Sequence, residues 1–203
     1  YLHYVSYIST FVLLQLTLNG LAFEYLWPAL PVWNGHALVL LLLLAILFAT
    51  QFTRALLEPW RVLPRNDRAL RGFMLLMGVG ALASLFVSYS IMILFATAAG
   101  LIGMVYLNLI GLACWKKGVK LAGIYLASWS IFLIGAAVYG LKASGLLPSA
   151  FITDYAIQAG SALEVLLLSF ALAYRIKLLK QENERMQYEG TANLEHNVTL
   201  RTE

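Results

Sequence analysis

The densest apolar run of the sequence, ALVLLLLLAILFA at 37–49, lies within one of six apolar runs that divide the chain. A helix needs about 20 apolar residues to cross the ~30 Å hydrocarbon core of a bilayer. The sequence therefore predicts an all-α fold, a polytopic transmembrane helix bundle. The six spans are expected at 4–25, 36–57, 70–89, 91–115, 121–141 and 152–174.

Composition excludes several classes of protein. The chain is 61% hydrophobic and 12% charged, too little charge to cover a soluble domain of this length. The net charge of +4 does not indicate a nucleic-acid partner, because the cations lie at the ends of apolar runs. The single cysteine, Cys114, excludes an intrachain disulfide framework, and three scattered histidines lack metal-ligand spacing. We expect neither a metal nor a cofactor.

The basic residues predict the orientation in the membrane. Arginines cluster between the second and third spans, lysines between the fourth and fifth, and both follow the sixth. These segments share one side if the spans alternate, and the opposite loops carry only Lys142. Because Lys and Arg are enriched in cytoplasmic loops, the C-terminus is expected in the cytoplasm.

The last span runs without Pro or Gly into a charged segment containing Arg175, Lys177 and Lys180. We expect a transmembrane bundle at 1–180 and a cytoplasmic helical linker at 181–203. Leu179 and Met186 are seven apart and Leu194 and Val198 four apart, with Gly190 between the pairs. This weak heptad pattern fits a parallel dimeric connector or a frayed polar terminus.

Glu164 is the strongest candidate for a functional residue. A carboxylate in mid-span costs several kcal/mol unless it is paired, protonated or facing water. It either contacts a ligand or switches state, or it is a neutral acid that fixes helix packing. No mid-span cation is available, so the expected partners are neutral polar residues: Asn108, Gln158, Ser161, Tyr106 or Tyr125.

The first span carries further candidates. Gln15 and Asn19 are four apart and are expected to share a face that points into the bundle. With Glu24 and Trp27, Asn19 could line a pocket near the outer surface, although packing polarity also explains these residues. Asn108 is expected to bond a neighbouring helix, and Arg54 to anchor the topology.

The spans lack a catalytic constellation. They hold no mid-span Lys, and the sequence contains no HExxH, P-loop or paired-aspartate protease motif. No catalytic residue is therefore expected, and the segment itself is not predicted to be an enzyme. Two function classes stay open: a signal-transducing receptor, and a small-solute transporter or channel with a polar pathway around Glu164, Asn108 and Gln15.

Three stretches resemble a known family: YLHYVSYISTFVLLQLTLNGLAFEYLWP, QFTRALLEP, and ALEVLLLSFALAYRIKLLKQENERM followed by LEHNVTLRTE. They are similar to the membrane module of bacterial seven-transmembrane receptors with diverse intracellular signalling modules. The matching features are a Tyr-rich entry, Gly20 before the Tyr25–Pro28 turn, the Glu164–Ile176 exit and the pattern at 194–202.

The resemblance implies that these residues are helices two to seven of a longer parent chain. It implies a receptor in the bacterial inner membrane that relays an extracytoplasmic stimulus through the last helix. The expected partners are the lipid bilayer, a second copy in a homodimer, and two domains of the parent chain. One is an extracytoplasmic sensor; the other is a cytoplasmic output domain, a diguanylate cyclase, histidine kinase or phosphatase, acting in two-component or cyclic-di-GMP signalling.

Overall fold

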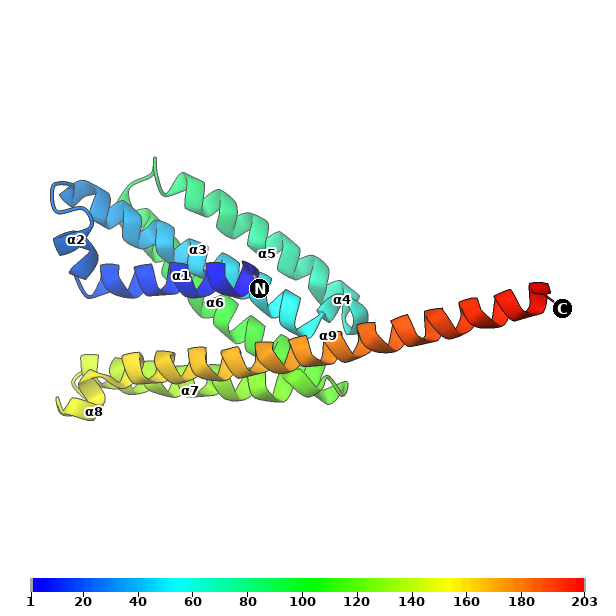
Figure 1. The fold of residues 1–203 in the computed structure, drawn as a ribbon. Helices are drawn as coiled ribbons and strands as arrows, with labels where there is room; N and C mark the ends of the chain where they lie inside the picture. The colour runs from blue at the N-terminus through cyan, green and yellow to red at the C-terminus, as the bar shows by residue number, and fades with distance from the viewer. Residues whose placement is uncertain (1, 203) are drawn as a thin grey trace. The chain divides into compact units, whose positions relative to one another are not determined.

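The computed structural model describes residues 2–202, and of residues 139, 143 and 190–202 it describes the backbone alone (Figure 1). Within 2–202 the regular structure is helical throughout, which confirms the predicted all-α class. The helices are α1 (Leu2–Leu18), α2 (Leu21–Tyr25), α3 (Pro31–Leu57), α4 (Pro59–Val62), α5 (Pro64–Ala83), α6 (Tyr89–Lys116), α7 (Lys120–Ala143), α8 (Phe151–Asp154) and α9 (Ala156–Thr202).

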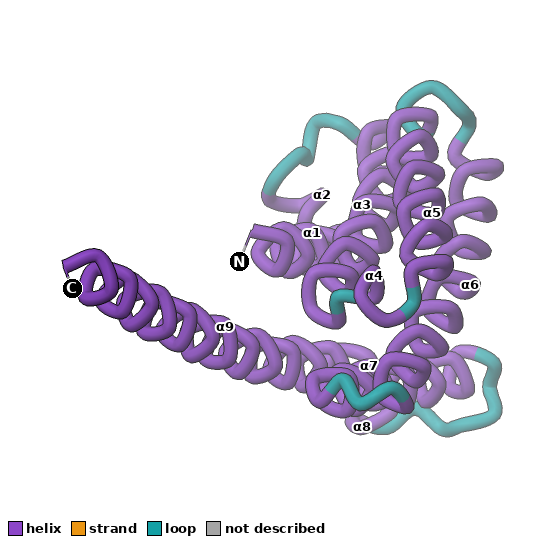
Figure 2. Tube along the Cα trace, turned by 90° about the vertical axis from the view of Figure 1, so that its right-hand side faces the viewer, coloured by secondary structure: helices purple, strands orange, loops and turns teal. Residues whose placement is uncertain are grey.

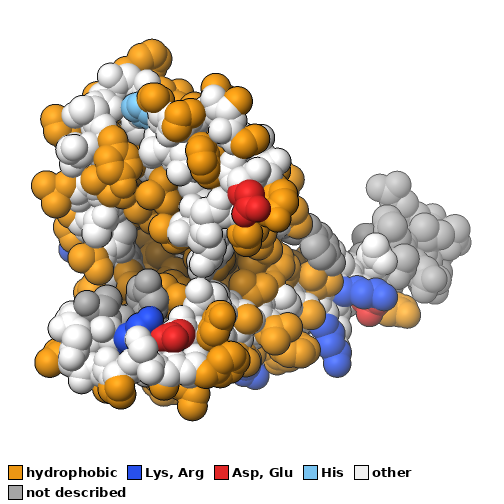
Figure 3. All heavy atoms as spheres, turned by 90° about the vertical axis from the view of Figure 1, so that its left-hand side faces the viewer, with side chains coloured by type: hydrophobic (Ala, Val, Ile, Leu, Met, Phe, Trp, Pro, Cys, Tyr) orange, Lys and Arg blue, Asp and Glu red, His pale blue; other side chains and the backbone are white. Residues whose placement is uncertain are grey.

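Four helices in the described part of the chain are long and apolar enough to cross a membrane: α3, α6, α7 and α9. The helix α1 is apolar but shorter. Large apolar side chains such as Phe86, Leu94 and Ile102 are exposed, and hydrophobic side chains dominate the face in Figure 3. Such a surface suits contact with lipid, and a polytopic membrane bundle fits these features.

The chain divides into two compact units, Tyr1–Trp129 and Ser130–Glu203. The division falls within α7. The boundary expected at residue 180, between bundle and linker, lies inside the unbroken helix α9 and stays a prediction.

The first unit is built around α3, which lies between α1 on one side and α5 and α6 on the other (Figure 2). Its core includes Val39 and Leu43 of α3, Met77 of α5, and Met92 and Ala96 of α6. The short, uncharged joint between α5 and α6 would suit a tight antiparallel pair of these two helices. The structure instead makes α3 their main partner, and the rings of large side chains fill the space between α5 and α6.

The first expected span, 4–25, is interrupted. The helix α1 ends at Leu18, and Gly20 takes a left-handed conformation with φ of 79° before the short helix α2. Gly20 has no Cβ to oppose this conformation, and its amide donates to the Thr17 carbonyl, which ends the helix. The apolar run continues through this break, so the run alone did not reveal it.

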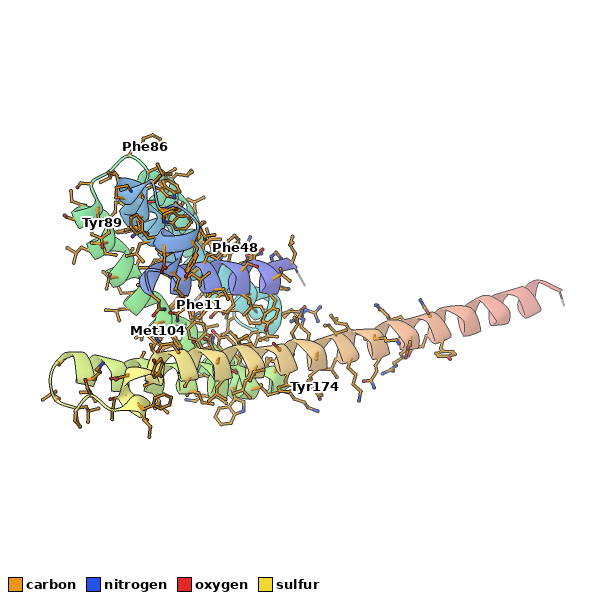
Figure 4. The ribbon with its side chains drawn as sticks, turned by 60° about the vertical axis from the view of Figure 1, so that its left-hand side comes forward. Phe11, Phe48, Phe86, Tyr89, Met104 and Tyr174 are labelled. Atoms are coloured by element: carbon orange, nitrogen blue, oxygen red, sulfur yellow. The ribbon has the colours of Figure 1, made fainter. Side chains whose placement is uncertain are left out.

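Two other boundaries differ from the expected ones. The helix α3 begins at Pro31 rather than near His36, because proline at the first helical position has its backbone angle preset and needs no donor. The third span was expected to reach Tyr89, but α5 ends at Ala83 and a turn follows. Phe86 lies in this turn and points outward (Figure 4).

The second unit comprises α7 from Ser130 onward, α8 and α9. The sixth span was expected from Ile152, but α8 ends at Asp154 and α9 begins at Ala156. Lys142 pairs with Asp154 at 2.7 Å and ties the end of α7 to α8. The helix α9 then continues through Gly190 to Thr202, 47 residues in all. The side chains of the LEHNVTLRTE stretch lie outside the described residues.

Candidate functional site

Among the residues whose side chains are described, a fully buried carboxyl group is found in each unit. In the first unit Asp67 is fully buried and lies against two arginines. In the second unit Glu164 is fully buried in α9. Because a charged group in an apolar region is costly unless it is satisfied, both places are candidates for function.

Asp67 joins α3 to α5 through Arg54. Arg54 Nε donates to Asp67 Oδ1 at 2.6 Å, and Nη2 donates to Oδ2 at 3.2 Å, a two-pronged pairing. Arg71, one turn along α5, donates from Nε to Asp67 Oδ2 at 3.0 Å. The side chain of Asp67 is 1% exposed, that of Arg54 16% and that of Arg71 62%. We call these three residues the Asp67 cluster.

Local structure explains how the chain brings the Asp67 cluster together. Glu58 adopts a left-handed conformation with φ of 47°, which ends α3 and turns the chain into α4. Pro64 then starts α5, and Asp67 falls in its first turn. A carboxylate at this position interacts favourably with the amide groups at the helix N-terminus. The turn therefore returns Asp67 to the end of α3, where Arg54 lies.

The Asp67 cluster extends to α1 and to an aromatic ring. Arg54 Nη1 donates to Gln51 Oε1 at 3.4 Å, and Gln51 Nε2 lies 3.5 Å from His3 Nε2 on α1. The Arg54 guanidinium also lies 5.9 Å from the centroid of the Trp60 ring. Contacts through Arg54 thus involve four helices of the first unit, α1, α3, α4 and α5, at one end of the bundle.

The electrostatics of the cluster favour an ionised Asp67. Hydrogen bonding from Arg54 lowers the pKa of Asp67 from 3.8 and outweighs burial, which raises it, with further lowering from the charge of Arg54 and from Arg71. Two guanidinium groups and one carboxylate leave the cluster with one excess positive charge. A buried carboxylate paired in this way holds its helices together, and removal of its charge would leave Arg54 without a counter-ion.

Glu164 lies on the buried stripe of α9. Gly160 precedes it by one turn and Leu168 follows it by one turn, and both are buried. Ser161, also buried, donates its hydroxyl to the Gln158 carbonyl of the same helix. The sequence predicted a mid-span carboxyl, and the structure places it away from the surface. Its role as a switch stays a prediction.

The helices α7 and α9 cross closely at Gly135 and Gly160. A Cβ placed on Gly135 of α7 would lie 2.5 Å from the Ala156 carbonyl oxygen, and one on Gly160 would lie 3.3 Å from the Ile131 carbonyl oxygen. A Cβ at 2.5 Å from a carbonyl oxygen would clash with backbone, so Gly135 requires glycine at this helix separation. At Gly160 the contact of 3.3 Å is tight, and the neighbouring backbone would have to shift by a few tenths of an ångström to accept a Cβ. The crossing lies one turn before Glu164.

The other predicted residues are dispersed. Asn19 and Glu24 are exposed and Gln15 is half-buried, so the expectation that Gln15 and Asn19 both point into the bundle is wrong for Asn19. The Asn19 amide donates to the Gln15 carbonyl of its own helix. Trp27 Nε1 donates to Asn34 Oδ1 at 3.0 Å. These contacts support a local role for Asn19 and Trp27 at the end of α1 and the start of α3.

Asn108 and the suggested partners of Glu164 also have local contacts. The Asn108 amide donates to the Met104 carbonyl one turn earlier in α6, rather than to the neighbouring helix that we expected. Tyr125 hydroxyl lies 3.0 Å from Thr53 Oγ1 and joins α7 to α3 within the first unit. Gln158 is half-buried, and its Oε1 is buried without a hydrogen-bond partner among the described residues.

At the exit of α9, Arg175 is half-buried, whereas Lys177 and Lys180 are exposed. Lys180 lies 3.9 Å from Glu184, one turn further along the helix. Among the described residues no group of three or more His, Cys, Asp or Glu is placed to hold a metal ion.

The sequence reasoning missed Asp67 and assigned Arg54 only an anchoring role. A signal was present, because Asp67 and Arg71 are four apart and would share a helix face. Pairing across helices between Asp67 and Arg54 could not be read from spacing, since it depends on the turn at Glu58.

A family model described as 7TM diverse intracellular signalling matches residues 1–175. The chain belongs to this family. The match spans both units of the fold and includes Arg54, Asp67, Gly135, Gly160 and Glu164. No curated protein and no solved structure matches the sequence.

Membership confirms the resemblance found in the sequence and establishes the coarse role of the chain. It is a multi-pass membrane protein with a transmembrane sensor or signalling role. The family is a sensor module rather than a catalytic one, and its description connects it with intracellular signalling.

Proposed function

We propose that this chain relays an extracytoplasmic stimulus through α9 to a cytoplasmic output domain of the same parent chain. The observation that carries the proposal is the continuity of α9, which runs unbroken from Ala156 to Thr202. A helix without a break transmits a rotation, tilt or shift of its membrane segment to its far end.

The charge pattern of α9 supports this direction of transmission. The helix is apolar around the buried Glu164 and becomes charged at Arg175, Lys177 and Lys180. Basic residues at the end of a span are typical of the cytoplasmic interface. Tyr174 precedes them on the helix and is exposed (Figure 4). From Glu164 to Glu189 the helix advances about 38 Å, at 1.5 Å per residue.

The close crossing of α7 and α9 offers a place where a stimulus could act on this helix. A stimulus shifts an equilibrium only as far as its affinity differs between the two states. Gly135 and Gly160 bring two backbones into contact, so a small change in the packing of α7 moves α9. Glu164, one turn away, has two hydrogen-bonding states, protonated and ionised, that can favour different packings.

The proposal includes a parallel homodimer in the bacterial inner membrane, with the C-terminus in the cytoplasm. Movement of the two α9 helices would change how two output domains pair. The output would be a diguanylate cyclase, a histidine kinase or a phosphatase, with residues 181–203 as the helical linker. An extracytoplasmic sensor domain of the parent chain would supply the stimulus or bind it.

A helical insertion series tests the relay. One to seven alanines are inserted between Gln181 and Glu182 of the parent protein, and the activity of its output domain is measured in membranes. Each alanine rotates the output domain by about 100° and advances it by 1.5 Å. Activity is expected to rise and fall with the helical period, with recovery near four and seven residues.

The matched control is the same series between Gly145 and Leu146, in the loop that joins α7 to α8. It should leave output unchanged, because the insertion does not alter the register of α9. Equal amounts of membrane-inserted protein are verified for every variant. Activity that declines steadily with length, without a period, would show that α9 does not act as a rigid connector.

A further inference from the structure

The outward face of α5 has a basic end followed by an apolar strip. Arg68, Gly72, Leu76 and Val79 are separated by three or four residues, so they share one face of the helix. All are exposed, as are Leu75 and Leu82 beside them. Within the described part of the first unit, no other helix covers this face.

The positive charge at the basic end is not neutralised within the protein. The carboxylate of Asp67 is buried, and its two oxygens already accept from Arg54 and Arg71. Arg65 and Arg68 are exposed and form no ion pair with a described residue. Two guanidinium groups on the first turns of α5 therefore lack a counter-ion, and a phosphate is a favoured partner for such groups.

Arg71 provides a connection between this surface and the Asp67 cluster. Its Nε and Nη2 lie 3.0 Å and 2.8 Å from Asp67 Oδ2. The side chain is nevertheless 62% exposed. Nη1 is not engaged by Asp67, so Arg71 can hold the carboxylate and an external phosphate at the same time.

The length of the apolar strip identifies the partner as a lipid rather than a free phosphate. From Gly72 to Ala83 the helix advances about 17 Å, at 1.5 Å per residue. This is close to the ~15 Å thickness of one leaflet of the hydrocarbon core. An acyl chain lying along the strip would place its headgroup phosphate at the level of Arg68 and Arg71.

We propose that this face of α5 is a binding site for an anionic phospholipid. Arg65, Arg68 and Arg71 bind the headgroup phosphate, and the strip from Gly72 to Leu82 contacts an acyl chain. The proposal goes beyond the signalling role, since it would hold for any output domain. It also gives the lipid a direct contact with the Asp67 cluster through Arg71.

The test measures lipid selectivity of the purified protein. The protein is reconstituted with equal amounts of phosphatidylglycerol and phosphatidylcholine, and native mass spectrometry gives the ratio of the two lipids that stay bound. Wild type should retain phosphatidylglycerol preferentially. In the double variant R65Q/R68Q the ratio of bound phosphatidylglycerol to bound phosphatidylcholine should fall about tenfold. Each basic residue near an anionic headgroup contributes a severalfold preference for the anionic lipid.

The matched control is K116Q/K120Q, which removes two exposed positive charges at the α6–α7 turn. It should keep the wild-type ratio. An equal loss in both variants would show general attraction of charge and overturn the site. Arg65 and Arg68 have no partner in the described chain to lose, so the thermal midpoint of R65Q/R68Q in phosphatidylcholine should match wild type.

A second measurement adds inorganic phosphate to phosphatidylcholine vesicles. If inorganic phosphate raises the thermal midpoint of the protein as much as phosphatidylglycerol does, the ligand of this site is a free phosphate and the lipid proposal is wrong.

Discussion

Arg54 and Asp67 join the end of α3 to the start of α5 through two hydrogen bonds, from Nε to Oδ1 at 2.6 Å and from Nη2 to Oδ2 at 3.2 Å. The two residues are thirteen apart in the chain. Their pairing closes the segment that contains α4 and holds one end of the first unit. The ionised state of Asp67 is therefore a condition for the arrangement of α3 against α5.

Asp67→Asn should destabilise the protein strongly. The amide keeps the shape of the side chain but removes its charge, which leaves Arg54, only 16% exposed, without a counter-ion. Loss of one partner of a buried ion pair costs ~3–5 kcal/mol. Thermal unfolding of the purified protein in lipid nanodiscs should show a clear fall in the midpoint temperature.

The matched control is Glu184→Gln, which removes a carboxylate from an exposed pair with Lys180 at 3.9 Å. Exposed pairs contribute little because water and salt screen them, so the midpoint should stay unchanged. An Asp67→Asn protein as stable as wild type would mean that the pair contributes no net stability.

The stability that Asp67 provides should depend on pH with a definite sign. Hydrogen bonding from Arg54 lowers the pKa of Asp67 in the folded protein below 3.8. As the pH falls, the carboxyl of Asp67 is protonated in the unfolded chain before it is protonated in the folded protein. The stability that the ionised Asp67 contributes is therefore complete above about pH 5, and it is lost as the pH falls below 3.8 through the folded pKa. The difference in midpoint between wild type and Asp67→Asn should therefore be constant from neutral pH to about pH 5 and narrow in stronger acid. A difference that widens below pH 3.8 would contradict this assignment.

Apolar runs were sufficient to predict the class of fold and the approximate position of each long helix, because crossing hydrocarbon requires long apolar segments. They did not predict where helices end inside such a run. Gly20 ends α1 through a left-handed backbone conformation, and α5 ends at Ala83 although apolar residues continue. Both ends depend on local backbone geometry, to which hydropathy is insensitive.

The candidate site was predicted only in part, for a related reason. Glu164 was evident from the sequence because it is a carboxyl in the middle of an apolar run. In the sequence Asp67 lies between two apolar runs, in a segment rich in arginine, where a lone carboxylate resembles ordinary surface charge. Its importance depends on the turn at Glu58, which returns the chain to Arg54 and buries the carboxylate. The spacing of residues in the sequence does not predict that Asp67 comes back to Arg54.

Gly135→Ala should alter both stability and signalling. Its new Cβ would lie 2.5 Å from the Ala156 carbonyl oxygen, so α7 and α9 must move apart. Overpacking of this kind costs ~1–3 kcal/mol, and the displacement of α9 should change the activity of the output domain. The measurements are the unfolding midpoint in nanodiscs and the output activity of the parent protein in membranes.

Gly140→Ala, in the same helix, is the control for this substitution. A Cβ at Gly140 meets nothing within 4 Å, and alanine favours a helix by ~1 kcal/mol over glycine. This variant should be at least as stable as wild type and keep its output. If Gly135→Ala behaves in the same way, the close crossing of α7 and α9 has no part in the relay.

Glu164→Gln should shift or lock the output while the protein still inserts into the membrane. Glutamine has nearly the same shape as glutamic acid and can replace the hydrogen bonds of the neutral form, but it cannot ionise. If two packings of α9 differ in the protonation of Glu164, the amide removes one of them. Output is measured in a reporter strain, with and without the stimulus of the parent receptor. Membrane insertion is verified by the amount of the variant protein in the membrane fraction.

The comparison variant is Glu182→Gln, an exposed carboxylate on the same helix. It should respond to the stimulus as wild type does, because water solvates Glu182 in either state. A third variant, Glu164→Asp, keeps the ability to ionise and should restore part of the response that Glu164→Gln loses. If Glu164 acts only through packing, Glu164→Gln should respond more like wild type than Glu164→Asp does, since aspartate is shorter and leaves a gap on the buried face of α9, whereas glutamine fills the site. The order of the two variants therefore decides whether Glu164 acts through its proton or through its shape.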